Sequence, residues 1–187
     1  MRRRDIETKI LAALMIVFAV VGCGGSSNLS SGGGSTSTGS SYPGTPDGAK
    51  ALLAEFAKPG ADTATLSKSL RPTKADYDAV FAPELAAKAD SVYGPAWDGG
   101  QLVIAPKPGQ TQVLVSHATT DELKSGAGGA ADFANGWKDV SAQLKPGVTF
   151  YTFKFVEPGQ SLGMAYDGLA YVNGNWRIFP KPWKVMR

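Results

Sequence analysis

The sequence predicts an α+β domain, with amino-terminal helices packed on a carboxyl-terminal, curved antiparallel sheet. Apolar residues recur at helical spacing between positions 47 and 94, whereas they alternate with polar residues between 149 and 178. The dipeptide Asn173-Gly174 interrupts that alternation, as in a two-residue hairpin turn. The helices and the strands therefore occupy separate stretches of the chain.

Four helices are expected before the sheet. Asp47 can cap the first helix, and Asp62 precedes the second. Thr73 has an acid three positions later, which is the spacing of a capping box and predicts a third helix. Pro83 suits the first turn of a fourth helix, which Gly94-Pro95 should end.

A mixed region is expected to follow the helices. Residues 111–118 alternate as a strand does, and Thr119 with Glu122 predicts one helical turn. Residues 126–136 have the composition of a loop, and Trp137 begins a short stretch of helical spacing.

From residue 149 on, the sequence predicts an antiparallel meander. Residues 151–155 and 162–166 alternate, and a bulge at Asp167-Gly168 accommodates the shift of the apolar set that follows. If Asn173-Gly174 forms a two-residue loop, the register of the last hairpin follows from it. The expected pairs are Val172 with Asn175, Tyr171 with Trp176 and Leu169 with Ile178.

The first 22 residues predict an export signal. Four bases within the first nine residues precede an uncharged apolar run of 12 residues, Ile10–Val21. A helix of that length spans about 18 Å, which is short of the roughly 30 Å hydrocarbon core of a bilayer. The run therefore predicts a cleaved signal peptide and not a permanent membrane helix.

Val20-Val21-Gly22-Cys23 resembles the lipobox of bacterial lipoproteins. The resemblance implies that diacylglycerol is joined to the Cys23 thiol, that residues 1–22 are removed, and that the new amino terminus is acylated. The alternative is a plain secretory signal followed by an incidental thiol. Two or three acyl chains hold a protein on a bilayer, because each buried methylene contributes about 0.8 kcal/mol. Gly24 after the lipidated residue implies the outer membrane, if the cell has one.

Residues 23–46 predict a flexible tether between the anchor and a single folded domain, residues 47–187. Between positions 24 and 46 the chain has 18 Gly, Ser or Thr residues and no charge. Such a segment cannot bury enough apolar surface to fold alone, and as a coil it spans about 25 Å. The 141 residues after it are enough for one core.

Composition and charge exclude several classes of site. The formal net charge is only +3, and four of the bases lie in the leader, so no basic face for nucleic acid is expected. One cysteine allows no internal disulfide, and one histidine argues against a zinc site. No metal and no cofactor are therefore expected.

Three sequence features are candidates for chemistry. Residues 126–131 match the G-x-G-x-x-A spacing of a dinucleotide-binding loop, but a plain loop is favoured because no long helix can follow. His117 is the only imidazole and could act as a general base, or it could simply bond to a loop. Asp167 could lie in the concavity of the sheet, where burial raises the pKa of a carboxyl, or it could only form the bulge.

Two interpretations remain open for the tail, Phe179-Pro180-Lys181-Pro182-Trp183-Lys184. Its prolines favour an extended path along the sheet edge, which the tail would cover. Alternatively, Trp183 and its lysine neighbours would contact lipid headgroups or an acidic partner.

The helices, the bulged long strand and the terminal hairpin with Trp176 resemble the NTF2-like fold in outline. That fold hosts both enzymes and non-catalytic domains. We expect a lipid-anchored cell-envelope protein, held on the membrane through Cys23, whose domain binds a small ligand or an envelope protein without catalysis, because no nucleophile motif is present. One alternative is a small NTF2-like enzyme with His117 and Asp167 as its acid/base pair. Another is a purely structural surface protein.

Overall fold

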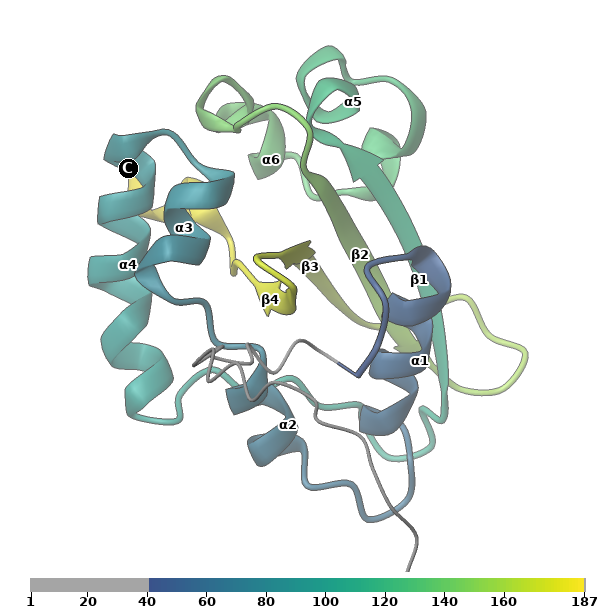
Figure 1. Ribbon diagram of the computed structural model, residues 1–187. Helices are drawn as coiled ribbons and strands as arrows, with labels where there is room; N and C mark the ends of the chain where they lie inside the picture. The colour runs from purple at the N-terminus through teal and green to yellow at the C-terminus, as the bar shows by residue number, and fades with distance from the viewer. Residues whose placement is uncertain (1–40, 187) are drawn as a thin grey trace, which may run out of the picture. The chain divides into compact units, whose positions relative to one another are not determined.

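The computed structural model describes residues 41–186, so the leader, the lipobox and most of the tether lie outside the described residues. Four α-helices precede the first strand of an antiparallel sheet, and the combination of helices with this sheet confirms the expected α+β fold (Figure 1). The elements, with η for 3-10 helices, are α1 Pro46–Phe56, α2 Thr63–Ser69, α3 Lys74–Val80, α4 Pro83–Asp98, β1 Gln112–Thr119, α5 Thr120–Ser125, η1 Gly128–Asp132, α6 Gly136–Asp139, η2 Ser141–Gln143, β2 Thr149–Val156, β3 Gly163–Val172, β4 Asn175–Ile178 and η3 Pro182–Met186.

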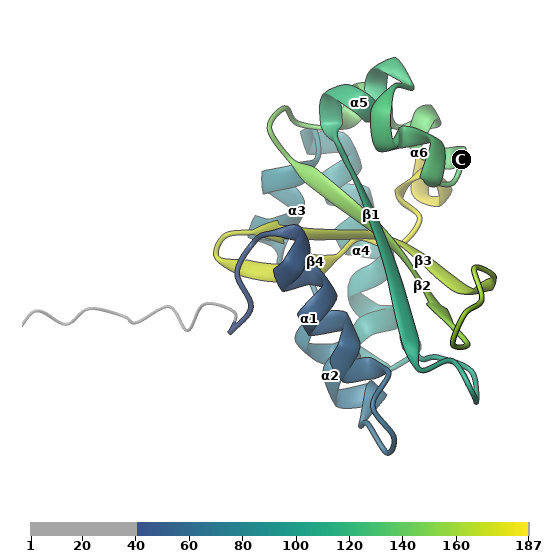
Figure 2. The ribbon, with the colours of Figure 1, turned by 90° about the vertical axis from the view of Figure 1, so that its right-hand side faces the viewer.

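The four strands form one antiparallel sheet in the order β1-β2-β3-β4. Each strand pairs with the next one along the chain, as in a meander. The sheet is strongly twisted, so that β1 crosses over the far strands in Figure 2. Because β4 is only four residues long, the first half of β3 has no partner on that side.

The turn between β3 and β4 has the predicted two-residue geometry. Asn173 and Gly174 have φ angles of 49° and 77°, and positive φ at both central residues defines a type I′ turn. The predicted register is confirmed in every pair, namely Val172 with Asn175, Tyr171 with Trp176 and Leu169 with Ile178.

The predicted bulge in β3 is also confirmed. Tyr151 pairs with Leu169 but the next residue, Thr152, pairs with Asp167, so Gly168 is the extra residue. Its φ of 90° lies in the left-handed region, and a Cβ there would collide with the carbonyl oxygen of Phe179. A glycine is required at this position, and the bulge turns Asp167 relative to the rest of β3.

Apolar side chains cover both faces of the sheet, because successive residues of a strand point to opposite faces. One cluster packs α1 and Trp97 of α4 on the face that carries Tyr151 and Phe153. The other cluster packs α3, most of α4, α5 and α6 on the face that carries Phe150 and Ala170. In Figure 2, α1 and α6 lie on opposite sides of the sheet.

Two predicted helix boundaries are wrong. Thr45 caps α1 and accepts a bond from the Gly48 amide, because Pro46 already occupies the first helical position and leaves Asp47 inside the first turn. α4 continues past Gly94-Pro95 to Asp98. Trp97 is only 4% exposed, and its burial outweighs the backbone bond that Pro95 cannot donate.

Thr73 and Asp76 form the predicted capping box at the start of α3, and Thr119 and Glu122 form a second one at α5. Residues 42–45, which the sequence places in the tether, pack on the domain: the Trp176 indole donates to the Tyr42 carbonyl oxygen at 3.2 Å. No helix among residues 41–186 has both the length and the apolar character needed to cross a bilayer.

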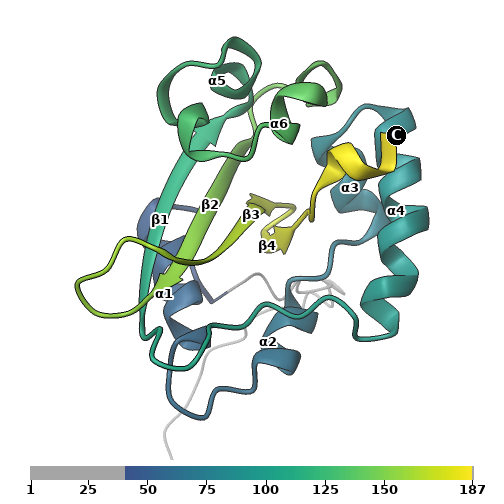
Figure 3. The same ribbon diagram turned by 180° about the vertical axis from the view of Figure 1, so that it is seen from behind.

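The carboxyl-terminal tail departs from its predicted extended path at Pro182, which begins η3. Figure 3 shows this segment leaving β4 and running toward α4. Trp183 is half-buried, and its ring lies 6.0 Å from the ring of Trp137. The tail therefore begins against β3, where the Phe179 amide donates to the Gly168 carbonyl oxygen at 2.8 Å, and from Pro182 on it packs on α4 and α6.

Candidate functional site

His117 and Asp167 lie on opposite faces of the sheet. His117 on β1 pairs with Tyr151, and the two rings lie 5.6 Å apart. Asp167 on β3 pairs with Thr152, the residue that follows Tyr151 on β2. Successive residues of a strand point to opposite faces, and cross-strand partners share a face. The fold does not bring these two side chains together as an acid/base pair.

A hollow of about 450 Å³ lies beside the half of β3 that β4 leaves unpaired. Tyr93 and Trp97 of α4 form one wall, and residues 101–104 form another. β3 contributes residues 164–167, and the segment from Ile178 to Lys184 closes the remaining side. Ligand sites in proteins commonly have volumes of roughly 300–1,000 Å³ and mostly apolar walls, and this hollow has both properties.

The wall formed by residues 101–104 is fixed although it has no regular secondary structure. The Ile104 amide donates to the Ser67 hydroxyl at 2.8 Å. The Tyr166 hydroxyl donates to the Ala105 carbonyl oxygen at 2.9 Å and accepts from the Ala105 amide at 3.1 Å. These bonds join the segment to α2 and β3, so the shape of the hollow does not depend on a loose loop.

Among the described residues, Asp167 is the one carboxyl group that lines this hollow. Burial raises the pKa of Asp167, and hydrogen bonds from Thr152 and the Ala134 amide, together with the charges of Lys181 and Lys154, only partly offset that rise. A carboxyl with a raised pKa keeps its proton to a higher pH than an ordinary one, and the protonated form can donate a hydrogen bond. Asp167 therefore both precedes the bulge residue Gly168 and lines the hollow.

Two lysines lie at the carboxyl-terminal wall, Lys181 and Lys184. Lys181 has a φ of 40°, which is uncommon for a residue with a Cβ and costs of the order of 1–2 kcal/mol. Its carbonyl oxygen accepts bonds from the Tyr93 hydroxyl at 3.0 Å and from the Lys184 amide at 2.9 Å. The strained backbone is therefore held by contacts that also keep Lys181 and Lys184 in the wall of the hollow.

The glycines of residues 126–131 do not form an open phosphate cradle. Gly126 ends α5 in the left-handed conformation. A Cβ on Gly128 would collide with the Glu122 side chain, and one on Gly129 would collide with the His117 carbonyl oxygen. These glycines allow η1 to pack closely against the end of β1, which is a structural role.

Residues 41–186 contain no group of three or more side chains able to hold a metal ion, and Cys23 lies outside that range. No protein-family model, curated protein or solved structure matches the chain. The resemblance to the NTF2-like fold and to bacterial lipoproteins therefore stays a prediction.

Most of the hollow could not be recognised in the sequence. Tyr93 and Trp97 share it only because α4 continues past Gly94-Pro95, where a helix end was expected. Lys181 and Lys184 stood out as part of a tail with unusual composition, but nothing local relates them to Asp167. The one available indication was the Asp-Gly bulge, which turns a carboxyl out of the regular strand.

Proposed function

We propose that the protein is a lipid-anchored protein of the cell envelope whose α+β domain binds a small ligand in the hollow beside β3. The hollow carries the binding part of this proposal, because its walls are largely apolar and its few polar groups converge on it. It also favours a binding domain over a purely structural surface protein. Separation of His117 from Asp167 favours binding over acid/base catalysis.

The support for the lipid anchor comes from the sequence. Residues 20–23 have the pattern of a lipobox, preceded by a short apolar run and followed by a Gly/Ser/Thr tract. Mass spectrometry of protein purified from membranes should find Cys23 at the amino terminus with acyl chains attached. Cys23→Ser should move the protein from the membrane to the soluble fraction. A free thiol in the native material, or a retained leader, would refute the anchor without affecting the binding site.

The lining predicts a ligand with an apolar body and one anionic group. Trp97, Met164 and Ile178 offer apolar contact, whereas Lys181 and Lys184 offer two ammonium groups at the same hollow. A neutral Asp167 would donate to an anionic oxygen, and an ionised one would repel it. A carboxylate, sulfonate or phosphate on an aliphatic or aromatic chain has this chemistry.

Octane-1-sulfonate is a suitable probe, because it stays ionised at every practical pH. The full chain in lipid nanodiscs is titrated by calorimetry, with empty nanodiscs as the blank and octanamide as the uncharged comparison. Lys181→Glu with Lys184→Glu should weaken sulfonate binding about tenfold, because two partly exposed charge interactions change sign. Octanamide binding should change little.

Lys50→Glu with Lys124→Glu is the matched control, because it makes the same change in net charge away from the hollow. This control pair should bind octane-1-sulfonate as the unsubstituted chain does. If the sulfonate does not bind, or if both pairs weaken its binding equally, the hollow is not the proposed anion site.

A further inference from the structure

β1 is an edge strand, and Figure 2 looks onto its outer side. The hydrogen bonds identify which of its backbone groups point outward. The Thr120 amide donates to the Val148 carbonyl oxygen at 2.9 Å, which continues the register Thr119–Thr149 by one step. In an antiparallel ladder such bonded pairs alternate, so the even-numbered residues of β1 bond to β2 and the odd-numbered ones point outward.

Two further contacts agree with this alternation. The Thr119 amide donates to the Glu122 carboxylate at 2.7 Å and not to β2. The His117 carbonyl oxygen lies against Gly129 of η1. The carboxyl-terminal end of the outer edge is therefore covered by α5 and η1. Outside the β1–β2 ladder, the described part of the chain offers no hydrogen bond to the N–H and C=O groups of Val113 and Val115, and the alternation directs these groups away from β2.

The strand itself carries none of the sequence features that normally protect an edge strand. Residues 112–119 contain no charged residue, no proline and no glycine, and no bulge interrupts their pairing with β2. Leu114 is 44% exposed on the sheet face opposite Val113 and Val115. An uncharged, regular strand with unpaired outward groups is a template for another strand.

We propose that β1 pairs antiparallel with β1 of a second copy, across a two-fold axis at Leu114. In this register Val113 of one copy faces Val115 of its partner, and both residues have outward N–H and C=O groups that are free to bond. The two Leu114 side chains then meet at the axis and cover each other. Such an interface gives a closed dimer, because both copies use the same sheet edge and neither is left free for a third copy.

The fit to a second copy follows from the strand itself. The register brings together only uncharged residues, so no like charges oppose each other. It needs no bond from the His117 carbonyl oxygen, which Gly129 already covers. A sheet that continues through both copies would leave neither β1 edge exposed.

Disulfide cross-linking tests the register. At the axis the two Leu114 Cα atoms would lie about 4.5 Å apart, as in a non-hydrogen-bonded pair, which suits a disulfide. Two Ser116 residues on the same strand and face would lie roughly 13 Å apart, beyond disulfide reach. In the full chain, Leu114→Cys should therefore give a covalent dimer on mild oxidation, whereas Ser116→Cys should not exceed the background of the unsubstituted chain.

A proline substitution tests the interface independently. The Val115 amide makes no bond to β2, so Val115→Pro should leave the sheet folded while removing an outward donor. Light scattering of the full chain in detergent should give twice the chain mass for the unsubstituted protein and the chain mass for Val115→Pro. Circular dichroism should show the same fold in both. A monomeric unsubstituted chain, or equal cross-linking at 114 and 116, would overturn the proposal.

Discussion

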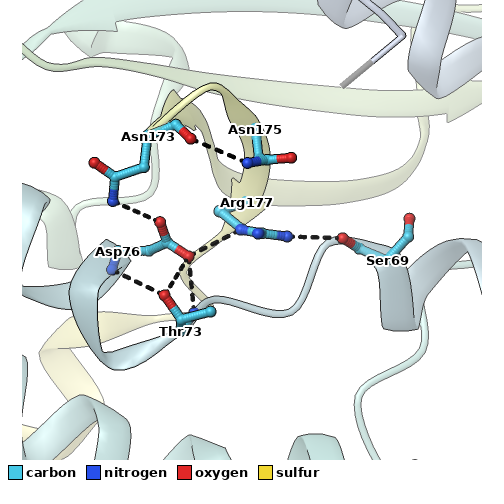
Figure 4. A network of polar contacts seen from close by, with 6 residues as sticks. All are labelled: Ser69, Thr73, Asp76, Asn173, Asn175 and Arg177. Atoms are coloured by element: carbon cyan, nitrogen blue, oxygen red, sulfur yellow. Dashed lines mark hydrogen bonds and ion pairs between the residues drawn. The ribbon is translucent and has the colours of Figure 1, made fainter. Parts of the chain in front are cut away.

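Asp76 and Arg177 are 101 positions apart in the sequence, and Nε of Arg177 donates to Oδ2 of Asp76 at 2.9 Å. Their side chains are only 3% and 18% exposed. Asp76 is also the capping-box acid of α3 and accepts from the Thr73 amide and from the Asn173 side chain at 2.7 Å (Figure 4). One carboxylate therefore joins the start of α3 to the β3–β4 hairpin.

Asp76→Ala should destabilise the domain by about 3–5 kcal/mol, because it leaves the Arg177 guanidinium buried without its partner. Urea unfolding followed by tryptophan fluorescence would measure the change in free energy. Asp78→Ala is the matched control, since Asp78 is on the same helix and its ion pair with Lys74 is exposed. The control should cost at most about 1 kcal/mol. Equal losses in both variants would show that Asp76 is not a central contact.

Acid should weaken the same contact. Burial of Asp76 raises its pKa, but hydrogen bonds from Thr73 and Asn173 and the charge of Arg177 outweigh burial, so the net shift is downward. A carboxyl with a lowered folded-state pKa stabilises the fold above its unfolded pKa of about 3.9, and this contribution is lost as the pH falls through the folded pKa. Asp76→Asn should show a smaller loss of melting temperature between pH 5 and pH 2 than the unsubstituted chain, to be measured by calorimetry.

Replacing Gly174 and Gly94 by alanine should change the stability of the domain in opposite directions. Gly174 has a φ of 77° in the type I′ turn, and alanine there should cost about 1–2 kcal/mol. Gly94 lies within α4, and a Cβ there would meet nothing closer than the Asp90 carboxylate at 3.8 Å. Gly94→Ala should stabilise the domain by about 0.5–1 kcal/mol. Thermal unfolding of both variants would decide; a stabilising Gly174→Ala would contradict the turn assignment.

Short-range patterns in the sequence predict this fold well where the chemistry is local. The Asn173-Gly174 turn set the register of β3 and β4, because the turn geometry leaves no other pairing. The capping box at Thr73 was recognisable for the same reason. The end of α4 could not be recognised in this way, because it depends on the burial of Trp97 against residues from distant elements. Tertiary packing of Trp97 outweighs the helix-breaking tendency of Gly94-Pro95 at this position.

The candidate site was largely hidden for the same physical reason. Its walls come from α4, residues 101–104, β3 and the tail, and no local pattern relates these four segments. The sequence did indicate Asp167, because an Asp-Gly bulge is a local signature. Strand order and register were needed to separate Asp167 from His117, and only the folded chain provides them.

Asp167→Asn should stabilise the domain at pH 7. Burial raises the pKa of Asp167, so above its unfolded pKa of about 3.9 the folded chain holds the proton more tightly, and stability falls as the pH rises through the folded pKa. Asparagine keeps the shape and removes the charge. Its melting temperature should exceed that of the unsubstituted chain at pH 7, and the difference should vanish below about pH 3.9. Asp121→Asn, at an exposed position, should show no such gain.

The same substitution should alter the pH dependence of ligand binding. Octane-1-sulfonate remains anionic throughout, so a change in its affinity between pH 4 and pH 8 reports groups of the protein. In the unsubstituted chain the affinity should fall as the pH rises, because the ionised Asp167 carboxylate repels the sulfonate that Lys181 and Lys184 attract. Asp167→Asn should bind the probe with nearly constant affinity over this range, since the substitution removes the carboxyl whose ionisation opposes binding. Calorimetric titrations at four pH values would measure both profiles. Parallel profiles would place the bound anion away from Asp167 and would contradict this arrangement of the ligand in the hollow.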